Sequence, residues 1–355
     1  MITIYKTDTF KDAAKYVTDV VKRVDKTNLS VMHTVLVPDR ASMEAERALL
    51  SAVSGSFNAQ VRTFRRLCAD ILPHTEYLSK AAGVMALSGI VADNVDKLTC
   101  FTKGVDTSGF VSDMYDIIST MKYCRITPNM LRRDDLPRGV RAKAADIALL
   151  YEGYLDYTAN RFVDSADKMD LLCKAIANST AVANGFFYLY DFDNLSAQEL
   201  AIVEQLARYA KGVTVACCVG DGYADKYLYL NDIYNGITAM CKANGITPVV
   251  VEGHAEHASA VTQQIGKHMF RYDNPKAVEC GNFVEMYQGT TRVQEVYALA
   301  CRVQKYVRSG GRFRDIYVVT SDVAKYTNAV STVFEEFDIP YFCDRQYALQ
   351  EHPYA

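Results

Sequence analysis

The stretch from Phe186 to Leu206 constrains the fold most, because it predicts a buried strand, a polar turn and an amphipathic helix in direct succession. Phe186–Tyr190 is an unbroken run of aromatic and aliphatic side chains, which is typical of a parallel strand covered on both faces. Ser196 and Glu199 have the S-x-x-E spacing of a capping box and predict the start of the helix. Ligands of open α/β sheets bind outside the carboxyl ends of strands, so the turn Asp191–Ser196 is the first candidate site, with a solvated loop as the alternative.

Composition indicates an ordinary globular protein with room for a large core. The chain has 355 residues, of which 50% are hydrophobic, and this length favours two or three domains. Its net charge of −3 means that any contact with nucleic acid must come from local clusters of basic residues. The apolar runs are shorter than the roughly 20 residues that span a bilayer, and the start MITIYKTDTFK lacks the apolar segment of a signal peptide. We therefore expect no membrane contact and a cytoplasmic location.

No pattern of metal ligands stands out. The 10 cysteines include no C-x-x-C pair and are interpreted as reduced thiols of the core. His254 and His257 form an isolated H-x-x-H without further ligands at suitable spacing. The sequence therefore predicts no metal site.

The first strand and helix lack the elements of a phosphate-binding loop. A strand at Ile2–Tyr5 and a helix at Phe10–Val24 are joined through KTDTFKD, and no glycine precedes Gly55. A phosphate loop needs glycines that let backbone N–H groups close around the phosphates. Lys6 and Lys11 do not stand in the context that such a loop requires.

Basic and aromatic residues follow the next two predicted strands. Arg40 and Ser42 lie just after the strand Met32–Val37. A short strand closed by Val61 is followed by Thr63, which can cap a helix whose first turn holds Phe64, Arg65 and Arg66. Cations at a helix N-terminus oppose the helix dipole, which favours an anion lying across them. An aromatic ring beside arginines suits single-stranded nucleic acid, whereas a core phenylalanine with solvated arginines is the alternative.

The remaining pattern predicts a helical insertion and then a second α/β unit. From Ser79 to about Ser179 the periodicity is helical almost throughout. After a linker that ends at Asn274-Pro275, strands are predicted at Phe283–Tyr287, Asp315–Thr320 and Pro340–Phe342, with helices between them. This βαβ rhythm predicts an α/β fold with parallel sheets. The chain ends soon after the second unit begins, which suggests a piece of a longer polypeptide.

The chain resembles the N-terminal part of AddB, also called RexB, the second subunit of bacterial AddAB-type ATP-dependent helicase–nucleases. The resemblance extends along nearly the whole chain in the same order. Its strings are VPDRASMEAE, VRTFRRLCADIL, YLYDFDNLSAQE, RFRDIYVV and FDIPYFCDRQYALQEHP.

This resemblance implies a superfamily-1 helicase-like architecture. The expected domains are a RecA-like domain at 1–76 and 181–277, a helical insertion at 77–180, and the start of a second RecA-like domain at 278–355. The family's AddA partner supplies the motor, and the AddB half holds single-stranded DNA and inspects it for a recombination hotspot.

The resemblance also implies that this chain has lost the chemistry of ATP hydrolysis. Active relatives place an Asp-Glu pair at the end of the central strand for magnesium and the attacking water, and the corresponding positions here are Tyr190 and Asp191. A tyrosine does not replace that aspartate as a magnesium ligand. Lys6, Lys11, Tyr190 and Asp191 are therefore interpreted as a degenerate nucleotide site, and no catalytic residue is predicted. The family's nuclease region, with its iron–sulfur cluster and magnesium, matches nothing in residues 1–355, so no cofactor is expected in this chain.

Positions that face the single strand in the family can be transferred one by one. They fall on Arg40, Ser42, Phe64, Arg66, Phe192 and Leu195. Arg40 departs from the usual glutamine, and Ala69 stands where a larger aromatic can occur, so the resemblance implies strand holding more directly than the reading of a hotspot sequence.

The resulting prediction is a helicase-like DNA-binding portion of an AddB protein that acts in double-strand break processing with an AddA-type partner. One alternative is a structural module that docks the partner without binding DNA. Another is an active nucleotide hydrolase whose atypical phosphate site uses Lys6 or Lys11.

Overall fold

A computed structural model of the chain describes residues 1–24, 28–73, 77–105, 107–133, 135–159, 161–164, 166–220, 229–253, 259–281 and 283–344. The chain divides into two compact units, Met1–Lys276 and Ala277–Ala355. Each unit is described by itself.

The first unit is built on a parallel sheet of six strands in the order β3-β2-β4-β5-β1-β6. The strands are β1 (Ile2–Thr7), β2 (Met32–Leu36), β3 (Ala59–Arg62), β4 (Gly185–Leu189), β5 (Gly212–Cys218) and β6 (Val249–Glu252). They lie where apolar runs of the sequence predict strands. The mixed α/β architecture confirms the predicted fold class and is consistent with a RecA-like fold.

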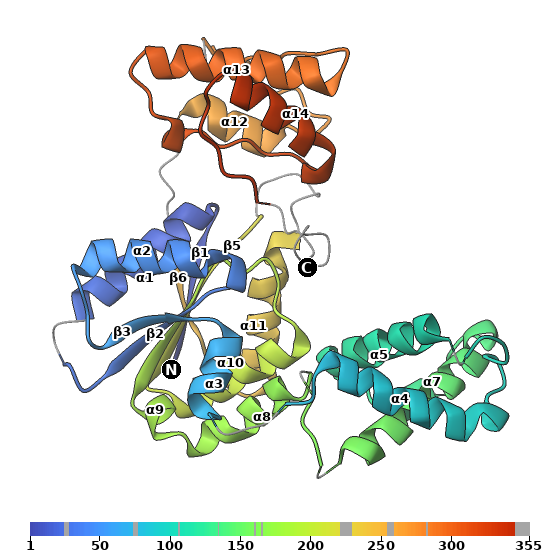
Figure 1. The fold of residues 1–355 in the computed structure, drawn as a ribbon. Helices are drawn as coiled ribbons and strands as arrows, with labels where there is room; N and C mark the ends of the chain where they lie inside the picture. Colours follow the sequence, from blue (N-terminus) through green and yellow to red (C-terminus); the bar gives the residue numbers. More distant parts are fainter. Residues whose placement is uncertain are drawn as a thin grey trace. The chain divides into compact units, whose positions relative to one another are not determined.

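Helices cover both faces of this sheet (Figure 1). On one face lie α1 (Phe10–Val24) and α2 (Ser42–Val53), and on the other lie α3 (Phe64–Ile71), α10 (Ala197–Tyr209) and α11 (Asn231–Ala243). Coverage on both faces explains why the central strands are continuously apolar rather than alternating with polar residues.

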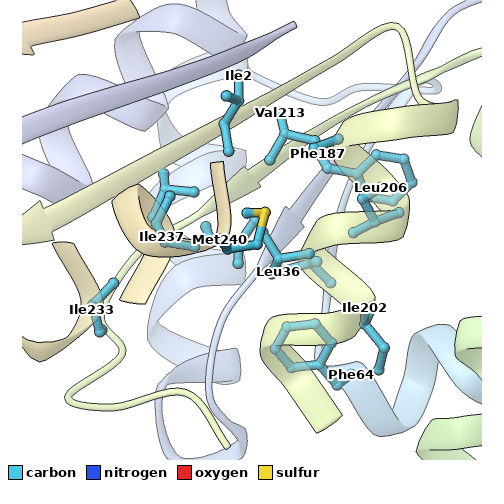
Figure 2. Close-up of a cluster of buried hydrophobic side chains, with 14 of the residues drawn as sticks. Ile2, Leu36, Phe64, Phe187, Ile202, Leu206, Val213, Ile233, Ile237 and Met240 are labelled. Carbon is cyan, nitrogen blue, oxygen red and sulfur yellow. The ribbon is translucent and has the colours of Figure 1, made fainter. Parts of the chain in front are cut away.

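The pleat of β4 divides its side chains between two cores. Phe187 and Leu189 face α10, whereas Tyr188 and the following Tyr190 face α1 and α2. Figure 2 shows the first of these cores, in which Phe187 and Val213 from the sheet lie near Leu206. Complete burial of one such aliphatic or aromatic side chain contributes about 1.5–3 kcal/mol.

The segment between β3 and β4 is helical, as predicted from its periodicity. After α3, its helices are α4 (Lys80–Asn94), α5 (Ser108–Tyr123), α6 (Pro128–Leu131), α7 (Arg138–Thr158), α8 (Lys168–Ala175) and α9 (Thr180–Ala183). Helices α4, α5 and α7 share a separate core that includes Leu87, Met114 and Leu150. α7 begins at Arg138, immediately after Pro137, a residue that favours a helix start.

A buried ion-pair network joins the end of α5 to the segment that leads into α8. The Nζ of Lys122, a residue that is 5% exposed, lies 2.8 Å from Asp164 and 2.9 Å from Asp167. Gln198 of α10 donates hydrogen bonds to the Ala166 carbonyl and to Asp170. Since a buried ammonium is tolerated only with close partners, this network fixes the end of α5 relative to α10.

One helix ends the first unit, and the two α-helices described in the second unit lie between the segments predicted as strands, as expected. They are α12 (Ala260–His268), α13 (Arg292–Arg308) and α14 (Val323–Glu336). The last two pack on each other through a small core that includes Val296, Ala300 and Phe334.

The strands predicted in the second unit are wrong for the residues that the structure describes. Phe283–Tyr287, Asp315–Thr320 and Pro340–Phe342 form no described strand. Their apolar side chains are largely solvent-exposed, with Phe283 at 74% and Val319 at 92%. A parallel strand needs neighbouring strands for its hydrogen bonds and cover on its faces, and the described part of this unit supplies mainly two helices that pack on each other.

The expectation for the cysteines is correct only in part. All 10 cysteines are free, but the core interpretation is wrong for Cys100, Cys124, Cys280 and Cys301, which are exposed. Within the described residues no cluster of His, Cys, Asp and Glu could hold a metal ion. His254 and His257 lie outside those residues. In the same part of the chain, no helix combines the length and apolarity needed to cross a bilayer.

Candidate nucleic-acid interface

A cleft of about 790 Å³ lies at the carboxyl ends of β2, β3 and β4. Most of its lining comes from the segments that follow these strands, around Arg40, Phe64 and Phe192. Tyr123 at the end of α5, with Lys168 and Met169 at the start of α8, completes the lining. The cleft therefore spans the predicted turn after β4 and the base of the helical insertion.

Arg40 joins the end of β2 to the turn after β4. It lies in the short 3-10 helix Asp39–Ala41, and its Nη1 is 2.5 Å from an Asp193 carboxylate oxygen. Its Nη2 donates to the backbone carbonyl of Asp191 at 2.9 Å. Two residues predicted from separate motifs, Arg40 and the turn at Phe192, are thus brought together at one edge of the sheet.

The turn itself has an uncommon backbone. Asp191 has a φ of +65°, in the left-handed region that few residues other than glycine adopt, although aspartate tolerates it better than most. Burial raises the pKa of its carboxyl group, while Arg40 opposes this shift. The predicted capping box is present, since the Ser196 hydroxyl accepts from Glu199 N–H and the Glu199 carboxylate accepts from Ser196 N–H. The turn is therefore held firmly at its carboxyl end.

Phe64 and Phe192 form an aromatic pair at the wall of the cleft. Their ring centroids are 5.6 Å apart and their planes make an angle of 52°. Phe64 is only 4% exposed and packs in the core near Ile202, as Figure 2 shows, whereas Phe192 is half-buried. Phe192 is consequently the more accessible ring of the pair.

The side chains of the two arginines at the start of α3 point to different surroundings. Thr63 caps the helix as predicted, because its hydroxyl accepts from the Arg66 backbone N–H. Arg65 lines the cleft with 77% of its side chain exposed and lies 3.7 Å from Asp39. Arg66 points to Glu46 of α2 at 3.0 Å and does not line the cleft.

The other predicted positions lie beside the cleft. Ser42 is half-buried at the first position of α2, and Leu195 packs partly buried against the sheet core. Neither residue is part of the cleft lining. The sequence pattern did not predict Tyr123 or Lys168 as site residues, and only the folded insertion brings these two residues to the strand ends. Arg65 belonged to the predicted basic and aromatic cluster, although the resemblance transferred only Phe64 and Arg66 from it.

The residues assigned to the degenerate nucleotide site lie less close to one another than the residues that line the cleft. The Lys6 ammonium lies 3.5 Å from Glu252 and 4.8 Å from the centre of the Tyr234 ring. Lys11 is exposed on α1. Tyr190 is 7% exposed and belongs to the core below α1 and α2, where burial raises its pKa to about 12.

The connection between β1 and α1 consists of two residues, Asp8 and Thr9. The Thr9 hydroxyl accepts from the Asp12 backbone N–H. The Asp12 carboxylate accepts from the Tyr5 hydroxyl at 2.7 Å and from the Thr7 hydroxyl at 2.8 Å. A carboxylate thus occupies the first turn of α1, the place where helices of nucleotide-binding folds receive phosphate.

Comparison with known families decides the relationship of the chain. The family model described as "ADDB, N-terminal" matches residues 12–266. The chain belongs to the AddB N-terminal family. Within this AddB region lie strands β2 to β6, the helical insertion and the cleft, whereas β1 precedes it.

Curated AddB relatives cover nearly the whole chain. The ATP-dependent helicase/deoxyribonuclease B subunit of Geobacillus kaustophilus is 29% identical over 346 residues, which are 90% of this chain and 30% of the relative. The protein of the same name from Listeria welshimeri is 26% identical over 355 residues, with 95% and 30% covered. The chain therefore spans about 30% of the length of these AddB relatives.

Proposed function

We propose that this chain is a catalytically inactive, helicase-like part of an AddB-type ATP-dependent helicase/deoxyribonuclease protein that holds single-stranded DNA during the processing of double-strand breaks. The observation that carries this proposal is the cleft at the carboxyl ends of β2, β3 and β4. Both its position in the sheet and its lining suit a nucleic-acid strand.

The lining supplies the two features that single-strand binding needs. Arg40, Arg65 and Lys168 provide positive charge for phosphates. Phe192 and Tyr123 provide aromatic faces for bases. Base–aromatic stacking tolerates any sequence because every base has a π face, so this combination supports holding a strand more directly than reading it.

The burial of Phe64 changes its proposed role. A ring that is 4% exposed offers no free face for a base. Its contact with Phe192 positions the more exposed ring at the cleft wall. We assign direct stacking to Phe192, and a supporting role to Phe64.

ATP hydrolysis has no place in the proposed function of this chain. A phosphate loop encloses phosphates with a run of glycine-rich backbone, and two residues between β1 and α1 are too few to form it. The Asp12 carboxylate in the first turn of α1 would repel a phosphate. With Tyr190 in the core, neither half of the nucleotide site is supplied, and the proposal assigns no cofactor to these residues.

The relatives are named as one subunit of an enzyme, which supports the presence of a partner. We propose an AddA-type motor as that partner, and the domain division expected from the sequence, with 278–355 as the start of a second RecA-like domain. The division of the chain into the units Met1–Lys276 and Ala277–Ala355 supports the last boundary.

Fluorescence anisotropy with a labelled single-stranded oligonucleotide tests the proposal. Arg65→Ala should weaken binding severalfold, because this cleft guanidinium is mostly exposed and is 3.7 Å from its nearest carboxylate partner. Arg47→Ala on α2 is the matched control, since Arg47 is exposed and does not line the cleft. Equal affinities of the two variants would contradict the assigned site.

A further inference from the structure

The cleft contains as many acidic as basic side chains. Its lining includes Arg40, Arg65 and Lys168, and also Asp39, Asp193 and Glu199. The phosphate backbone of a bound nucleic acid would therefore meet a nearly neutral surface, although the cleft lining contains three cations. A carboxylate that lies close to one of these cations stands where a phosphate would bind.

Asp193 is the carboxylate with that position. It lies 2.5 Å from Nη1 of Arg40, whereas Asp39 lies 3.7 Å from Arg65. Glu199 is engaged by the backbone N–H of Ser196 in the capping box. Asp193 is thus the carboxylate of the lining that makes a close contact with a cleft guanidinium.

Arg40 is also held from a second side. Its Nη2 donates to the Asp191 carbonyl at 2.9 Å, a contact that does not involve the Asp193 side chain. The residue that supplies this carbonyl, Asp191, has a left-handed backbone conformation. If Asp193 moved away, Arg40 would remain directed at the cleft by this second hydrogen bond.

We infer that the Asp193 carboxylate occupies the place of a DNA phosphate on Arg40, and that a bound strand exchanges one of its phosphates for this carboxylate. The inference rests on the proposed function and adds a residue that sets the affinity of the site. Both partners are about half exposed, with side-chain exposures of 56% for Arg40 and 51% for Asp193, so the exchange needs no opening of the core.

The exchange also has a consequence for selectivity. Breaking the Arg40–Asp193 pair costs part of the binding free energy of every strand. A strand that places several phosphates along the cleft recovers this cost at other cations, whereas a single small anion does not. Asp193 therefore favours polyanionic strands over isolated anions.

The test measures the affinity of the 355-residue chain for a labelled single-stranded oligonucleotide by anisotropy. Asp193→Asn should tighten binding roughly two- to tenfold. The neutral amide competes less with a phosphate for Arg40, and it does not repel the phosphate as the carboxylate does. Asp19→Asn, which makes the same charge change at an exposed site on α1, should leave the affinity unchanged. In an Arg40→Gln background, Asp193→Asn should lose most of its effect.

The outcomes separate this inference from the proposed function. Binding by the wild type with no gain in Asp193→Asn overturns the inference alone, as does an equal gain in the Arg40→Gln background. Absence of saturable binding in the wild type and in Asp193→Asn overturns the proposed function and the inference with it.

Discussion

The ring centroid of Phe64 lies 5.6 Å from that of Phe192, so a core side chain supports the aromatic wall of the cleft. The two residues should consequently respond differently to substitution. Phe64→Ala should lower the free energy of unfolding by about 3–5 kcal/mol, because it leaves a cavity among buried side chains. Phe192→Ala should instead weaken single-strand binding by about 1–3 kcal/mol, the range for loss of one stacked base.

Urea denaturation and anisotropy together check this pair. Phe64→Leu provides a milder control that keeps most of the core volume and should retain near wild-type binding. Unchanged affinity in Phe192→Ala would contradict the stacking role.

A second prediction concerns nucleotide binding. Isothermal titration of the chain with ATP and Mg²⁺ should give no saturable heat, because the two-residue connection after β1 cannot enclose phosphates and Asp12 repels them. Lys6→Met and Lys11→Met should give the same flat titration. Saturable binding that either substitution abolished would favour the nucleotide-hydrolase alternative.

A third prediction concerns acid stability of the helical insertion. Asp146 of α7 is 2% exposed and accepts hydrogen bonds from the backbone N–H groups of Thr99, Cys100 and Phe101. Burial alone would raise the pKa of its carboxyl group, but these hydrogen bonds outweigh it and hold the pKa below the ordinary value. Because the folded state then binds the proton less tightly than the unfolded state, the stabilisation exists above the unfolded value of about 4 and is lost as pH falls through the folded pKa.

Urea denaturation of the wild type and Asp146→Asn at several pH values measures this effect. At pH near 7 the variant should be less stable by roughly 1.5–3 kcal/mol, the range for hydrogen bonds to a charged group. The difference should shrink as the solution is made more acidic than pH of about 4. A difference that did not change with pH would rule out the carboxylate as its source.

A fourth prediction tests the corrected part of the fold. Amides of Phe283–Tyr287 and Asp315–Thr320 should exchange with deuterium much faster than those of Gly212–Cys218, because β5 lies between β4 and β1 in the sheet. Hydrogen exchange read by mass spectrometry distinguishes these peptides. Equal protection would mean that the second unit forms the strands that its sequence predicts.

Local chemistry explains which elements were predictable. The apolar run before Asp191, the Ser196 capping box and the Thr63 cap each express a short-range rule, and the structure contains all three. The same apolar-run rule gave strands near Phe283 and Val319 that the structure does not contain. Such a run reports an intrinsic preference for extended backbone, whereas a strand also needs a neighbour that the run does not specify.

The lining of the cleft could be predicted only in part, because local sequence rules do not specify how distant elements pack together. The strand-end rule indicates the carboxyl edge of the sheet, and Arg40, Phe64 and Phe192 line one cleft at that edge. It could not distinguish the buried Phe64 from the half-buried Phe192, since that difference depends on how α3 packs on α10. Lys168 enters the cleft through the path of the insertion, which no local spacing reveals.

Salt dependence of single-strand binding tests the central claim most directly. If Arg40, Arg65 and Lys168 each neutralise one phosphate, the logarithm of the affinity should fall linearly with the logarithm of salt concentration, with a slope of about −2. Arg65→Ala should reduce the steepness by roughly 0.7, the contribution of one phosphate contact on a single strand. Binding that is absent at low salt, or that does not depend on salt, would contradict the claim that this cleft holds single-stranded DNA.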